Sequence, residues 1–163
     1  MDAATYISTF PDSAVAAPQI LATPEFRRSI LQEMHPTPSL ELLPLVRKLL
    51  PLEVAYRADE SNDGEFFENL YWAALFLYQI GTLDDVIPMW KAKRTNCDTG
   101  FGFDIQFLVG QGVDETIAYC CGLNTQNAQA AADYIAECKD CGDFDYLDEW
   151  LAFWIDYYSN TAA

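Results

Sequence analysis

Residues 65–80 carry apolar side chains on nearly every side of a helix. One helical face holds Phe66, Phe67, Leu70, Tyr71, Ala74, Leu75 and Tyr78, and a second holds Trp72, Phe76 and Ile80. A helix that is apolar all round is stable when neighbouring elements cover it. Gly81 ends the segment as a C-cap, and Thr82–Asp85 opens the next helix with a variant of the capping box. The segment therefore predicts a central helix followed, after a tight turn, by an antiparallel one.

The rest of the chain also carries helical patterns. Thr23 and Pro24 begin a helix that ends near Met34, because a hydroxyl N-cap followed by proline is typical of a first turn. Ser39 caps a second helical segment with a leucine stripe. Residues 52–58 are compatible with either helix or extended chain. Further helices are expected over residues 103–109, 113–121, 124–138 and 145–158, and loops over residues 59–64 and 95–102.

No stretch alternates with the period of two that a half-buried strand requires. Residues 1–22 contain Pro11, Pro18 and many small side chains without a period, which is typical of an irregular arm. The chain is therefore predicted to be all-α: a single domain of about seven helices over residues 23–163, packed as antiparallel helical hairpins, preceded by an irregular N-terminal arm over residues 1–22.

The charge of the chain limits its partners. It has 163 residues, with 25 Asp and Glu against 9 Lys and Arg, so the formal net charge is −16. Such a surface repels nucleic acid and anionic membranes and favours a basic partner. The longest apolar run, Tyr71–Tyr78, is far shorter than the roughly 20 residues that span a bilayer. The first residues also lack the pattern of a secretory signal, so we expect a cytoplasmic protein without membrane insertion.

Two acidic segments are the candidate partner-binding sites. Residues 59–68 contain five acidic side chains and residues 140–156 contain six, with no basic residue in either segment. In the last helix, spacings of four and seven place acids opposite an apolar stripe of Trp150, Trp154 and Tyr158. The alternative is a merely solvated face. The predicted binding residues are Asp59, Glu60, Asp63, Asp143, Asp145, Asp148, Glu149 and Asp156.

The sequence offers weak signals for chemistry. Its one histidine belongs to no nucleophilic or zinc-hydrolase motif, so no catalytic residue is predicted. Asp98 and Asp104 are compatible with a pair of acid and base carboxylates, but their positions fit helix starts better. Cys138 and Cys141 have the spacing of zinc ligands. The five cysteines fit reduced, mostly buried thiols better, so we expect no metal or other cofactor.

One block of the sequence resembles a known family. Met89–Leu108, which reads MWKAKRTNCDTGFGFDIQFL, is similar to a block of small acidic helical bacterial immunity proteins, and the resemblance extends over residues 65–158. Within the block, Trp90, Phe103 and Phe107 are expected in the core. The resemblance implies a protein that neutralises one cognate toxin by binding it, and it implies no catalytic residue.

The sequence thus predicts an immunity-type inhibitor that binds a toxin with a basic surface through its acidic patches. Two other functions remain open at this stage. One is a metal- or carboxylate-dependent enzyme that uses Asp98 and Asp104 or the cysteines. The other is a scaffold subunit of a larger complex.

Overall fold

The computed structural model describes residues 1–10 and 19–161, and within them every regular element is a helix, as predicted. These residues form nine α-helices and four short 3-10 helices rather than about seven helices. The α-helices are α1 (Ala3–Thr9), α2 (Pro24–Met34), α3 (Leu43–Ala58), α4 (Asn69–Ile80), α5 (Val86–Lys93), α6 (Cys97–Gly102), α7 (Val113–Gly122), α8 (Gln126–Asp140) and α9 (Leu147–Thr161). The 3-10 helices are η1 (Ile20–Ala22), η2 (Leu40–Leu42), η3 (Leu83–Asp85) and η4 (Ile105–Val109).

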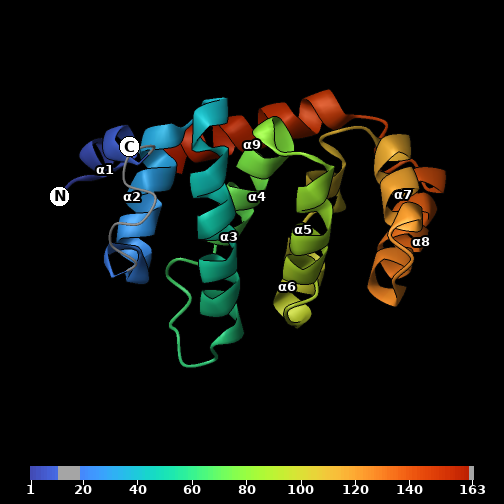
Figure 1. Cartoon of the computed structure of the whole chain (residues 1–163), viewed down its shortest axis with the longest axis horizontal. Coiled ribbons are helices and arrows are strands. Elements are labelled where there is room, and N and C mark those ends of the chain that lie inside the picture. Colours follow the sequence, from blue (N-terminus) through green and yellow to red (C-terminus); the bar gives the residue numbers. More distant parts are fainter. Residues whose placement is uncertain (11–18, 162–163) are drawn as a thin grey trace.

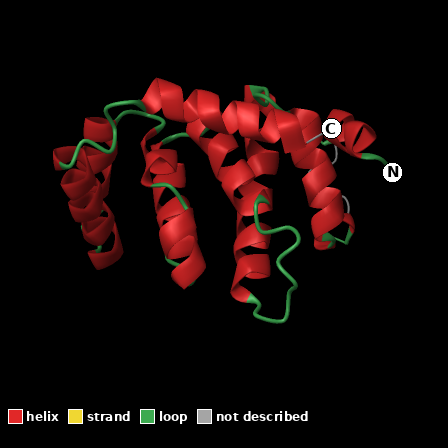
Figure 2. Cartoon of the chain, turned by 180° about the vertical axis from the view of Figure 1, so that it is seen from behind, coloured by secondary structure: helices red, strands yellow, loops and turns green. Residues whose placement is uncertain are grey.

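The helices before α9 stand side by side in a row, and α9 crosses that row (Figures 1 and 2). The closest packing is between α3 and α4 and between α7 and α8. The predicted pairing of α4 with the helix that follows it is not among the close contacts, because α5 packs mainly on α3, η4 and α8. From the end of α8, α9 runs back across the row to α2, where the His35 ring nitrogen Nε2 lies 2.9 Å from Ser159 Oγ. The last helix therefore joins both ends of the row.

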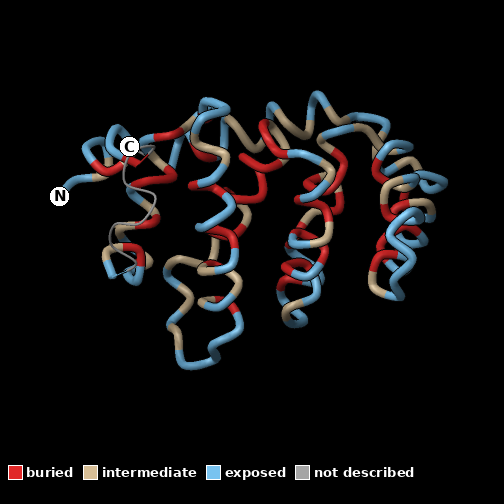
Figure 3. Tube along the Cα trace, in the orientation of Figure 1, coloured by how far each residue is buried: buried red, intermediate tan, exposed pale blue. Residues whose placement is uncertain are grey.

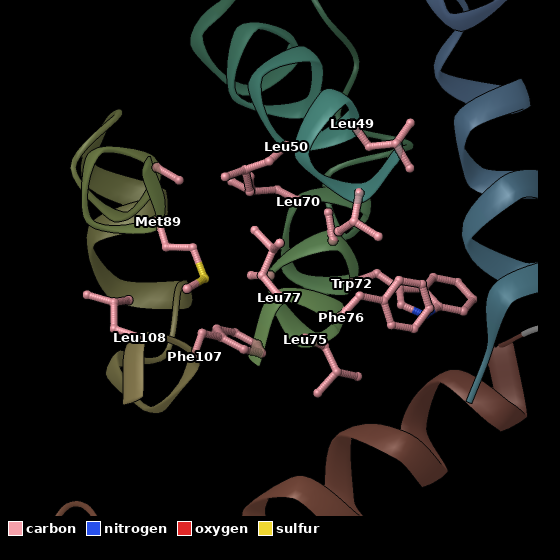
Figure 4. Packing of buried hydrophobic residues seen from close by; sticks show 14 of the residues in the cluster. Leu49, Leu50, Leu70, Trp72, Leu75, Phe76, Leu77, Met89, Phe107 and Leu108 are labelled. Atoms are coloured by element: carbon pink, nitrogen blue, oxygen red, sulfur yellow. The ribbon is translucent and has the colours of Figure 1, made fainter. Parts of the chain in front are cut away.

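The predicted central helix is confirmed as α4. It begins at Asn69 rather than residue 65, because residues 65–68 form a turn. Most of its side chains are buried, and Figure 4 shows Leu77 on the side of α5 and η4, while Trp72 and Phe76 lie on the side of α2. The buried hydrophobic cluster extends from α1 to α9. This extensive burial explains why α4 needs no polar face.

A buried polar cluster joins α2, α3 and α4 within this apolar interior. The guanidinium of Arg27 donates to both carboxylate oxygens of Glu53, and Arg27 Nη1 also donates to the Leu21 carbonyl at 2.9 Å. Asn69 Nδ2 donates to Glu53 at 3.3 Å, and Arg28 Nε donates to Asn69 Oδ1 at 2.6 Å. Since buried charges are stable only when they are paired and hydrogen-bonded, this cluster fixes the relative positions of the three helices.

The local start and stop signals mostly agree with the structure. Pro24 is the first residue of α2, and Met34 is its last. The Thr82–Asp85 capping box is present, with the Thr82 amide donating to Asp85 Oδ2 at 2.8 Å. The ambiguous residues 52–58 are helical and complete α3. Helix α8 is capped by the Thr125 hydroxyl, one residue after the expected Asn124.

Three local predictions need correction. The arm over residues 1–22 contains a helix, α1, that Asp2 caps and that packs Tyr6 into the core; residues 11–18 lie outside the described part. The expected loop over residues 95–102 contains α6, because Asn96 and Thr99 form a capping box. The last helix begins at Leu147 instead of Asp145. Helices α1 and α6 are short, and short helices show too few turns for a periodic signal.

Candidate interaction surface

The inner side of α9 is fastened to the row by aromatic side chains. The rings of Tyr158 and Trp72 are stacked with centroids 4.3 Å apart. The indole Nε1 atoms of Trp150 and Trp154 donate to the same oxygen, Asp104 Oδ2, at 2.8 Å and 2.9 Å. As predicted, these three α9 side chains form the inward stripe. Their contacts determine which side of α9 faces outward.

The side of α9 next to the inward stripe combines aromatic rings with carboxylates. Glu149, Phe153, Asp156 and Tyr157 follow the helical period on this side, and all four are exposed; we call them the α9 outer face. Phe153 is 60% exposed, and its ring stacks on that of Tyr157 with centroids 6.1 Å apart and planes 27° from parallel. Figure 3 shows α9 along the upper edge of the molecule, exposed over much of its length. A pair of stacked, exposed aromatic rings is a feature of binding surfaces rather than of solvated ones.

The side chain of Tyr157 is held in position by Glu68, in the turn before α4. Its hydroxyl donates to Glu68, and this hydrogen bond raises the pKa of Tyr157 above its ordinary value. The guanidinium of Arg28 lies 3.9 Å from the second oxygen of Glu68 and 5.6 Å from the ring centre of Trp72. The α9 outer face is therefore supported by the polar cluster of α2 and α4, which reduces the side-chain entropy lost on binding.

The predicted acidic residues do not form one surface. Asp143 and Asp145 are exposed in the turn before α9, and Asp148 is exposed in its first turn beside Glu149. Asp156 lies farther along the same helix. The other three, Asp59, Glu60 and Asp63, belong to the loop between α3 and α4, at the edge of the row away from α9 (Figure 1). The loop acids and the α9 outer face therefore lie on different parts of the molecule.

Two of the three loop acids have a structural role. Asp59 Oδ1 accepts hydrogen bonds from the Ser61 amide at 2.9 Å and the Ser61 hydroxyl at 2.6 Å, and these bonds lower the pKa of Asp59. Asp63 Oδ1 accepts from the Glu65 amide at 3.1 Å. Both carboxylates thus form the turns that lead into α4, which is a common use of Asp in loops.

Most of the basic side chains interact with other groups of the molecule, whereas many carboxylates are exposed to solvent. Arg57, Lys48 and Arg94 lie over aromatic rings, with the Arg57 guanidinium carbon 3.9 Å from the ring centre of Phe67. Lys93 is buried and donates to two carbonyls of residues 100 and 103, and burial lowers its pKa. Other basic side chains form ion pairs, which among the described residues are Arg27–Glu53, Arg28–Glu68, Arg47–Asp85 and Lys139–Asp114.

Asp98 and Asp104, the candidate acid and base carboxylates, have different surroundings. Asp104 is occupied by the two indoles, and Asp98 is exposed in the first turn of α6. All five cysteines are free thiols; Cys120 and Cys138 are buried, whereas Cys97, Cys121 and Cys141 are exposed, so the expectation of mostly buried thiols is wrong. No cluster of three or more His, Cys, Asp or Glu side chains suited to a metal ion occurs among residues 1–10 and 19–161.

The block that carries the family resemblance contains both buried and exposed residues. Trp90, Phe103 and Phe107 are buried, as predicted. The chain matches no known protein-family profile, no curated protein and no solved structure. In the part of the chain that the structure describes, no helix has the length and apolar character needed to cross a membrane.

Sequence reasoning found the acids of α9 but missed the aromatic residues between them. Phe153 follows Glu149 by four residues, so it shares the face of that acid, and Tyr157 follows Phe153 by another four. The spacing was readable in the sequence. Exposure was not, because α9 carries aromatic side chains on both sides and only its crossing of the row decides which side is covered.

Proposed function

We propose that this protein is an inhibitor of the immunity type, which binds a basic toxin protein through the α9 outer face. The single observation that carries the proposal is the exposed, stacked pair of Phe153 and Tyr157 between the carboxylates Glu149 and Asp156. Aromatic side chains supply most of the binding energy at such interfaces, whereas carboxylates accelerate association with a basic partner. The resemblance of residues 65–158 to immunity proteins supports the same function.

The overall charge supports a basic partner as well. Residues 140–161 contain six acidic and no basic side chains, so no cation within this segment offsets its negative charge. Charge complementarity of this kind raises association rates by roughly 10- to 1,000-fold, and salt removes the gain. Binding should therefore be fast at low ionic strength, with the dissociation rate set by the two rings.

Affinity capture from the source cell tests this proposal. The tagged protein should retain one dominant basic protein at low salt, and purified chain should then neutralise the activity of that protein. A triple variant with Glu149→Gln, Phe153→Ser and Asp156→Asn should lose the capture. The matched control carries Asp59→Asn, Glu60→Gln and Asp63→Asn in the loop between α3 and α4, and it should retain the partner.

Measured association and dissociation rates separate the contribution of the carboxylates from that of the aromatic rings. Neutralising Glu149 and Asp156 alone should slow association roughly 10-fold at low salt and change dissociation little, whereas Phe153→Ser should mainly speed dissociation. Equal capture by the triple variant, or a captured protein whose activity the chain leaves unchanged, would refute the proposed function.

A further inference from the structure

A groove lies between α3 and α5, on the side of the row away from α9. Its volume is about 530 Å³, which is within the usual range of small-molecule sites. Helices α3 and α5 are in front of α9 in Figure 1, whereas α9 is in front in Figure 2. Its wall and floor are apolar and come from three helices: Leu50, Pro51 and Val54 of α3, Leu77 of α4 and Pro88 of α5.

Most of the charged groups at the rim of this groove are already occupied. The Arg47 guanidinium donates to both oxygens of Asp85, at 2.7 Å and 2.9 Å, and to the Thr82 hydroxyl at 2.9 Å. Asp84 Oδ1 accepts a hydrogen bond from the Tyr119 hydroxyl at 2.9 Å. The Arg47–Asp85 pair is neutral as a unit, so it closes one end of the groove without attracting a charged ligand.

Lys91 is different from the other basic residues. It lines the groove from the last turn of α5 and is exposed, and its ammonium has no ion pair or ring contact within residues 1–10 and 19–161. Every other Lys or Arg side chain has a partner inside the molecule. Among the described residues, Lys91 is thus the one Lys or Arg side chain without such a partner, and it lies at the edge of an apolar groove.

We propose that this groove binds an amphiphilic carboxylate, such as a medium-chain fatty acid. The apolar tail would lie on Leu50, Val54 and Leu77, and the carboxylate would pair with Lys91. The charged Asp84 also lines the groove, but it precedes Lys91 by seven residues, which is roughly 10 Å along a helix. Salt screens charges that are more than about 8 Å apart at physiological ionic strength, so the ligand carboxylate would sit at the Lys91 end. The affinity would come from apolar burial, at up to roughly fourfold for each buried CH₂ group, and from a charge-assisted hydrogen bond at the rim.

Calorimetric titration of the full chain with decanoate tests the site. We expect one decanoate per chain, with weaker binding of octanoate and hexanoate in that order. Lys91→Met keeps the apolar stem and removes the charge, so it should weaken decanoate binding about 10-fold. Val54→Trp should fill the groove and abolish binding. The matched control Lys139→Met removes an exposed ammonium elsewhere and should bind decanoate like the unaltered chain.

Decanol supplies the second control, because it has the same tail without the charge. It should bind the unaltered chain about as weakly as decanoate binds Lys91→Met. The proposal is overturned if folded protein, checked by circular dichroism, binds no decanoate at millimolar concentration. It is also overturned if decanoate binding is insensitive to Lys91→Met, or if decanol binds equally well. The α9 outer face shares no residue with this groove. The outcome of the decanoate experiment therefore neither supports nor contradicts the proposed toxin binding, which is tested separately.

Discussion

The ring of Tyr158 lies flat on the indole of Trp72, with centroids 4.3 Å apart and planes within 8° of parallel. Both side chains are fully buried, although they come from the last helix and the central helix, α9 and α4. This contact fastens α9 across the row. It therefore determines which residues of α9 are left exposed for a partner.

Removing the Tyr158 ring should detach this part of α9. We expect Tyr158→Ala to lower the free energy of unfolding by about 3–5 kcal/mol, the usual cost of deleting a buried aromatic ring. Tyr158→Phe loses only the hydrogen bond from the hydroxyl to the Glu68 carbonyl, 3.3 Å long, and should cost at most about 1.5 kcal/mol. Urea denaturation measures both values, and equal losses in the two variants would contradict the role of the ring.

The Asp104 carboxylate should be required as an acceptor. Asp104→Ala leaves the indole N–H groups of Trp150 and Trp154 without their shared partner and should cost about 2 kcal/mol. Asp104→Asn retains an oxygen in the same position and should cost clearly less. Thermal unfolding of the two variants, followed by tryptophan fluorescence, provides the comparison. An Asn variant as unstable as the Ala variant would show that the charge, rather than the acceptor, matters.

Two glycines give opposite predictions for the same substitution. A Cβ atom at Gly110 would lie 2.1 Å from the backbone oxygen of Tyr78, so Gly110→Ala should destabilise the fold by about 3 kcal/mol. Gly100 lies within α6 and has open space around it, so Gly100→Ala should stabilise the fold by about 0.5–1 kcal/mol. Chemical denaturation of the pair tests the prediction. A neutral Gly110→Ala would mean that η4 and α4 are not in close contact.

The cysteines should differ in reactivity. Burial, together with a hydrogen bond to Asp143, raises the pKa of Cys138 from 9.0 to about 11. The thiolate is the reactive form, so at pH 8 Ellman's reagent should modify the exposed Cys97, Cys121 and Cys141 quickly and Cys138 slowly. Rapid reaction of all five thiols in folded protein would contradict this.

The raised pKa of Cys138 also predicts that the free energy of unfolding depends on pH. Above pH 9 the unfolded chain loses the Cys138 proton while the folded chain keeps it, so this contribution to stability is complete below pH 9 and is lost as the pH rises through about 11. Cys138→Ala removes the group, and its unfolding free energy should therefore fall less steeply over this range. Denaturation curves at pH 8 and pH 10.5 compare the two proteins. An identical decline in both would refute the assignment.

Local sequence patterns predicted much of the fold. The all-round apolar pattern of residues 65–80 identified α4, and the capping residues placed the start of α2 and the turn before α5 within a residue or two. These signals are reliable because a helix and its caps depend on residues within four positions of one another. The short α1 and α6 escaped prediction because one or two turns do not establish a period.

By itself, the sequence determined the helical class, the acidic charge and the apolar stripe of the last helix. Only the tertiary structure decided that α9 crosses the row, that Phe153 and Tyr157 are exposed together, and that Lys91 borders a groove. The reason is physical: the bond between Asp104 and Trp154 joins residues 50 positions apart, and the one between Tyr157 and Glu68 joins residues 89 apart. Contacts of this kind depend on how whole helices pack, which no pattern within one helix encodes.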